Sequence, residues 1–128
     1  MARPERKVKE RLRRAIPAGF SLHMIELRTG EVGWPDMIYL GPDRKCGFIE
    51  AKWIYSYANP LGRWEVPQRT WVKKRLEMGF PCYVLIGDAL NTWLLDAAVH
   101  LESDIILESV GKWGKSINKL ELQNILTK

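Results

Sequence analysis

The most constraining feature of this 128-residue chain is a pair of strand-like runs on either side of a tight turn sequence. Residues 37–40 and 46–53 are rich in apolar, β-branched and aromatic side chains, and Gly41-Pro42-Asp43-Arg44 between them is typical of a turn. The pattern predicts a β-hairpin centred near residue 43. In such a hairpin, position i of the first strand faces position 86 − i of the second, to within about one residue.

This hairpin would bring acidic and basic side chains together. Asp36 faces Glu50, and directly opposed residues on one face have Cβ atoms roughly 4.5 to 5.5 Å apart. Side chains alternate along a strand, so Glu50 and Lys52 share a face. Two carboxylates suit Mg²⁺, which keeps several waters and is commonly completed by substrate phosphate. The chemistry predicted is metal-assisted hydrolysis of a phosphodiester, in which Lys52 orients or deprotonates the attacking water.

Each half of this pattern alone specifies little. Pro-Asp is common in turns, and Glu-x-Lys is common on solvated strands. Their placement on paired strands is what indicates a site. The second Pro-Asp pair, Pro42-Asp43, is assigned to the turn, because Asp is favoured there.

Length and composition are those of one globular domain, with 46% hydrophobic and 27% charged residues. No apolar run approaches the roughly 20 residues that span a bilayer, and the basic N-terminus lacks the apolar segment of a secretory signal. We therefore expect a cytoplasmic protein without a membrane partner. Cys46 and Cys82 are expected to be reduced thiols in the core, and His23 and His100 lack the clustering of a zinc site.

The charge distribution favours a polyanionic partner. The net charge is +5, and seven cationic residues fall within the first fourteen positions, with a second basic cluster at residues 69–75. Such runs are either solvated helix surfaces or phosphate contacts, and the phosphate-cleaving pattern favours the second reading. The side chains predicted to contact DNA are Arg6, Lys9, Arg13, Arg69 and Lys73.

The N-terminal segment offers an additional acid. Apolar residues spaced by three and four predict an amphipathic helix from about residue 4 to 16. Glu5 lies on its apolar stripe, so it either frays into solvent at the first turn or reaches over the sheet edge to the carboxylate pair. Glu10 lies almost opposite, and Glu26, in a predicted strand at 20–27, is an alternative accessory carboxylate.

The remaining elements complete an α/β domain of order αβββαβ, with a mixed sheet and a helix on either side. The core covers about residues 4–96, and a helical extension at about 97–128 either completes it or forms a dimer contact. Further elements are expected as helix 67–78 stopped by Gly79, strands 81–87 and 92–95, helix 99–110, and helix 116–126 capped by Ser116.

The motif Pro35-Asp36 followed by Glu50-Ala51-Lys52 resembles the signature of the PD-(D/E)xK nuclease superfamily. Within it, the chain is most similar to VRR-NUC nucleases, in which a loop and a helix with a glutamine near its start follow this strand. The similarity spans roughly residues 5 to 88, including Gln68. The departures are Ala51, in place of a commoner branched or leucyl residue, and Trp53.

The resemblance implies a restriction-endonuclease-like core and a Mg²⁺- or Mn²⁺-dependent DNA endonuclease. Glu5, unlike Glu10, is followed by apolar residues three and seven positions on, as in the family, which implies that it holds a second metal or its water shell. Gln68 would orient Lys52 or the scissile phosphate. The implied metal ligands are Asp36, Glu50, the Ala51 carbonyl and Glu5.

Compact nucleases resembling this chain are often phage-encoded homodimers that act on branched DNA such as four-way (Holliday) junctions or flaps. A dimer suits a junction, because two related cuts need two sites at one spacing. A phage-encoded member would act in the host cytoplasm. Two alternatives stay open. One is a sequence-specific duplex endonuclease, for which so small a chain has few elements left to read bases. The other is a non-catalytic nucleic-acid-binding module.

Overall fold

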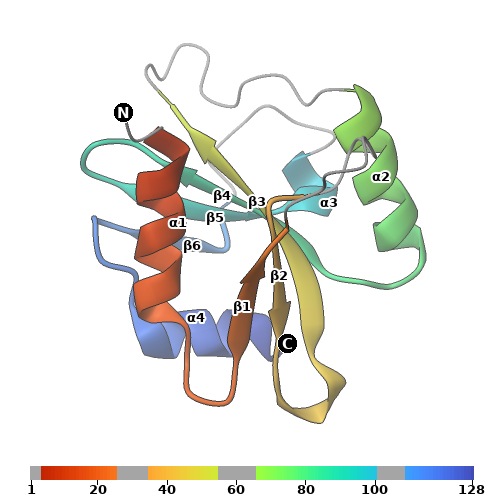
Figure 1. The fold of residues 1–128 in the computed structure, drawn as a ribbon, viewed down its shortest axis with the longest axis horizontal. Helices are drawn as coiled ribbons and strands as arrows, with labels where there is room; N and C mark the ends of the chain where they lie inside the picture. The colour runs from red at the N-terminus through yellow and green to blue at the C-terminus, as the bar shows by residue number, and fades with distance from the viewer. Residues whose placement is uncertain (1–3, 26–34, 55–65, 101–108) are drawn as a thin grey trace.

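The computed structural model describes residues 4–25, 35–54, 66–100 and 109–128. It is an α/β fold built on one six-stranded mixed sheet, with strand order β1-β2-β3-β4-β5-β6 (Figure 1). The strands are β1 (Ser21–Met24), β2 (Met37–Leu40), β3 (Cys46–Trp53), β4 (Cys82–Gly87), β5 (Thr92–Asp96) and β6 (Gly111–Trp113). The helices are α1 (Pro4–Ala15), α2 (Val66–Glu77), α3 (Ala97–His100) and α4 (Lys119–Leu126).

The predicted hairpin is confirmed in its strands, its turn and its register. β2 and β3 pair antiparallel from Met37 opposite Ile49 to Leu40 opposite Cys46. These pairs follow the predicted 86 − i relation without a shift. The turn contains a short 3-10 segment, in which Asp43 has a φ of 55°. That left-handed conformation is tolerated by Asp, and it explains why this residue belongs to the turn.

The helix and strands that follow the hairpin are also confirmed. α2 ends before Gly79, whose φ of +90° is the left-handed conformation that commonly terminates a helix. The chain then returns as β4, parallel to β3, with Glu50 opposite Val84. β5 pairs antiparallel with β4. In the turn between them, the Asp88 carboxylate accepts hydrogen bonds from the backbone N–H groups of Leu90 and Asn91.

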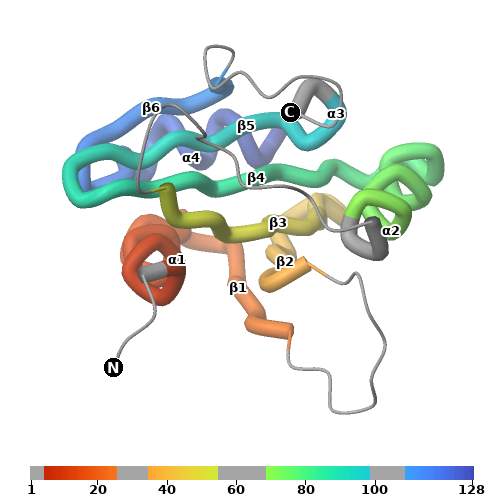
Figure 2. The backbone as a smooth tube through the Cα atoms, turned by 90° about the horizontal axis from the view of Figure 1, so that it is seen from above, coloured from red at the N-terminus to blue at the C-terminus, as the bar shows by residue number. Residues whose placement is uncertain are grey.

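Helices cover both faces of the sheet, as predicted (Figure 2). Val8 and Leu12 of α1 and Leu122 of α4 are fully buried against one face. Trp71 and Val72 of α2 pack on the other face, in the same cluster as α3. The structure therefore has a sheet between two helical layers, and β3 contributes side chains to both.

The C-terminal extension differs from the prediction. It is not purely helical, because Gly111–Trp113 adds strand β6 to the edge of the sheet beside β5. The predicted helix 99–110 is wrong at its end, because Ser109 and Val110 are not helical; α3 is described as far as His100, and residues 101–108 lie outside the described residues. The cap of the last helix is Asn118 rather than Ser116, since the Asn118 side chain accepts a hydrogen bond from the Glu121 N–H.

The same segment completes the core. Leu122 and Leu126 of α4 are buried in the cluster that α1 forms with the sheet. Both cysteines are free thiols, as expected, but only Cys82 is buried; Cys46 is half-buried. Within the described part of the chain, none of the helices combines the length and the apolar character of a membrane-spanning segment.

Candidate active site

Strand β3 presents two chemically different faces. Ile49 and Ala51 are buried in the core on the α1 side. Phe48 packs against the cluster on the α2 side, and alternation places Glu50 and Lys52 on that same face. Glu50 is only 6% exposed, and it is the one charged residue that is buried in the described ranges. A buried carboxylate at this place requires a specific compensation.

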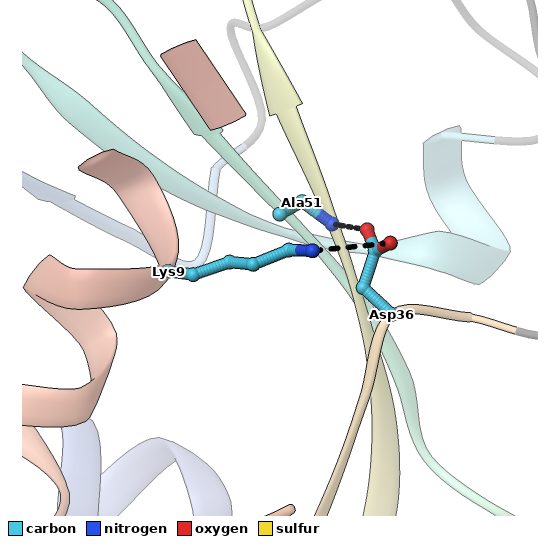
Figure 3. Close-up of polar contacts among 3 residues, drawn as sticks. All are labelled: Lys9, Asp36 and Ala51. Atoms are coloured by element: carbon cyan, nitrogen blue, oxygen red, sulfur yellow. Dashed lines mark hydrogen bonds and ion pairs between the residues drawn. The ribbon is translucent and has the colours of Figure 1, made fainter. Parts of the chain in front are cut away.

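Asp36 lies beside Glu50 because the hairpin register extends by one residue beyond Met37 and Ile49. Two contacts, one from β3 and one from α1, hold its carboxylate (Figure 3). The Ala51 backbone N–H donates to Asp36 Oδ2 at 2.8 Å. The Lys9 Nζ, reaching from α1, lies 3.5 Å from Asp36 Oδ1. These contacts fix Asp36 against the middle of β3.

Ionisation of Glu50 is unfavourable in this position. The pKa of Glu50 is raised to about 8. Burial is the larger cause, and repulsion from the Asp36 carboxylate is the second. The Lys52 ammonium acts in the opposite direction and offsets only part of the rise. Positive charge at this position would therefore stabilise the ionised form of Glu50.

The donor set fits a hard divalent cation. Mg²⁺ and Mn²⁺ suit carboxylate oxygens, and Mg²⁺ commonly takes only one or two protein carboxylates, with waters and substrate phosphate completing the shell. Asp36 and Glu50 provide such a pair. Groups of three or more His, Cys, Asp or Glu side chains that could hold a metal do not occur in the described residues. A site here would thus depend on backbone, water and substrate oxygens.

The structure does not bring the predicted accessory acid Glu5 into this cluster. Its side chain is exposed in the first turn of α1, which corresponds to the solvent alternative of the two expected. The α1 side chain that contacts Asp36 is Lys9, a residue that had been predicted to contact DNA. Glu10 lines a different pocket, and Glu26 lies outside the described residues.

The other predicted site residues are placed as follows. Gln68 belongs to the first turn of α2, but its side chain lies outside the described ones. Arg6, Arg13, Arg69 and Lys73 are exposed, so their positions allow contact with a polyanion. The metal-binding role of the Ala51 carbonyl stays a prediction. The Ala51 N–H donates a hydrogen bond to the Asp36 carboxylate.

Comparison of the chain with protein-family models, with curated proteins and with solved structures gives no match. Function is therefore inferred from the side chains of the site and their surroundings.

Proposed function

We propose that the chain is a Mg²⁺- or Mn²⁺-dependent DNA endonuclease with a restriction-endonuclease-like core. The observation that carries the proposal is the buried Glu50 beside Asp36, with Lys52 two residues further along the same strand face. A carboxylate that is buried beside a second carboxylate is costly to ionise, because burial and the neighbouring negative charge both disfavour its charged form. Functional sites are where such perturbed groups gather.

In this proposal Asp36 and Glu50 hold the cation, and the Ala51 carbonyl is a third ligand. When bound, the cation supplies charge neutralisation at the scissile phosphate and makes a water more acidic. Lys52 orients the attacking water, and in its neutral amine form it would accept the water's proton and become an ammonium. Lys9 and the Ala51 N–H keep the Asp36 carboxylate in position. Gln68 keeps the accessory role inferred from the family resemblance, whereas Glu5, exposed in the first turn of α1 and outside the carboxylate cluster, has no role in the proposed site.

The proposed substrate is branched DNA, cut by a homodimer in the cytoplasm. The exposed cations on α1 and α2 supply contacts to backbone phosphates, which make binding salt-dependent. Phosphate contacts position a duplex without reading its sequence. This favours recognition of DNA shape over recognition of a short sequence.

The test is cleavage of end-labelled four-way junction, flap, linear duplex and single strand, each with and without Mg²⁺. The Lys52→Ala variant is expected to lose about 10²- to 10⁴-fold in rate, the usual contribution of a general base, while its DNA affinity persists. Lys112→Ala removes an exposed lysine from edge strand β6 and serves as the matched control, with unchanged cleavage. If the wild type binds all four substrates yet cuts none with Mg²⁺ or Mn²⁺, the nuclease proposal is wrong and the protein is a nucleic-acid-binding module.

A further inference from the structure

A second feature of the molecule is a pocket of about 560 Å³ on the α1 side of the sheet. It lies where α1 passes the end of β3 and the turn between β4 and β5 (Figure 1). Ala89 and one acid, Glu10, contribute to its lining. The rest of the lining is cationic or aromatic: Arg6, Lys7, Arg11, Arg14, Lys115 and Trp53.

Arg11 forms the fixed wall of this pocket. Its guanidinium donates hydrogen bonds to the backbone carbonyls of Asp88 and Asn91 and to the Thr92 hydroxyl, at 2.8 to 2.9 Å. Its Cζ also lies 5.7 Å from the centre of the Trp53 ring. These bonds tie α1 to the β4–β5 turn, and they hold Trp53 against a rigid neighbour.

The other cations of the pocket are exposed. Arg6, Lys7, Arg14 and Lys115 all present their side chains to solvent, and the Lys7 Nζ lies 5.8 Å from the Trp53 ring centre. Like charges gathered around one hollow repel each other unless an anion joins them. The pocket therefore combines a half-buried indole with a cationic rim.

We propose that this pocket binds one nucleotide of a single-stranded nucleic-acid segment, with its base against Trp53 and its flanking phosphates on the cationic rim. An aromatic platform within a basic groove is the usual design of single-strand sites. The volume falls in the range of small-ligand sites, whereas a double helix is far too wide to enter.

The location links the pocket to the carboxylate pair. Trp53 is the last residue of β3 and follows Lys52 directly. At about 3.3 Å per residue, it lies roughly 10 Å along the strand from Glu50. The assignment to a substrate strand rests on the proposed nuclease function: an unpaired arm held at Trp53 on the α1 face would pass around the end of β3 to bring a phosphate to Glu50 and Lys52 on the α2 face.

Binding of a fluorescein-labelled single-stranded 10-mer, measured by anisotropy in EDTA, tests this inference without any cleavage. The double variant Lys7→Gln/Arg14→Gln is expected to bind at least tenfold more weakly. Its slope of log affinity against log salt should fall by about 1.4, because two phosphate contacts to a single strand are lost. Trp53→Leu should also weaken binding, and Trp53→Phe should restore most of it.

The matched control is Lys119→Gln/Lys128→Gln, which neutralises two exposed lysines outside the pocket and is expected to change affinity less than twofold. Equal affinities of the pocket variant and this control would overturn the inference. Competition by dAMP as strong as that by the unlabelled 10-mer would overturn the assignment to a strand. If the pocket variant loses affinity but the wild type shows no Mg²⁺-dependent cleavage, the single-strand site stands and only the nuclease proposal is overturned.

Discussion

At the scale of single residues, Glu50 carries the chemical argument. Its carboxyl is buried between β2 and β4, and the partly exposed Asp36 carboxylate adds a second negative charge beside it. A carboxyl whose pKa rises on folding stabilises the folded state most below its unfolded pKa. That contribution disappears as the pH rises through the folded pKa, here about 8.

A pH prediction follows for the protein without metal. In EDTA, ionisation of Glu50 should lower the free energy of unfolding between pH 5 and pH 9 by on the order of 2–4 kcal/mol. Glu50→Gln removes the ionisation with little change of shape, so this variant should not show that part of the loss. Urea denaturation of both proteins at the two pH values measures the difference. Parallel loss of stability in both would show that Glu50 titrates normally.

The placement of the site residues could be predicted in part from the sequence. Asp36 opposite Glu50 followed from turn chemistry and the period of two in strands, and Asp43 was recognised as a turn residue. The contact of Lys9 with Asp36 was not predicted. Helical periodicity gives the face on which a lysine lies, but not which of several cations reaches a particular carboxylate across the packed interface.

At the scale of elements, the position of α1 depends on a close approach to β4. A Cβ at Gly87 would lie 2.6 Å from Val8 Cγ2 and 3.1 Å from Arg11 Nη1. Gly87→Ala should therefore push α1 away from the sheet and cost about 1–3 kcal/mol of stability. The midpoint of urea denaturation measures this.

Gly114→Ala is the matched control, because a Cβ there would meet its nearest atom, the Leu90 carbonyl oxygen, at an ordinary 3.6 Å. Its denaturation midpoint should stay close to that of the wild type. If Gly87→Ala unfolds at the same urea concentration as Gly114→Ala, α1 does not pack on β4 as described.

Elements with strong local signals were predictable, and weak ones were not. α1 has a clear apolar periodicity, the hairpin has its turn residues, and α2 is marked by Pro67 near its start and Gly79 just after its end rather than by an apolar stripe. β6 is only three residues long, too short to display alternation, and its pairing with β5 is a tertiary contact. Ser116 and Asn118 are both good caps, so the start of α4 could not be assigned from residue type alone.

At the scale of the whole molecule, β3 connects two distinct surfaces. Glu50 and Lys52 project toward the α2 side, while Trp53 contributes to the basic pocket beside α1. The excess positive charge of +5 suits a partner that follows both surfaces around the end of this strand. The α/β architecture was predictable because each layer has its own apolar pattern. The completion of the core by the C-terminal segment required the structure.

The central claim is that Asp36 and Glu50 form a divalent-metal site, and calorimetric titration of Mn²⁺ into the protein at pH 7 tests it most directly. We predict saturable binding by the wild type, its loss in Asp36→Asn, and its retention in Asp43→Asn. The last variant changes the other Pro-Asp pair, at an exposed turn whose left-handed φ also suits Asn. No saturable binding by the wild type, or equal loss in both variants, would contradict the claim.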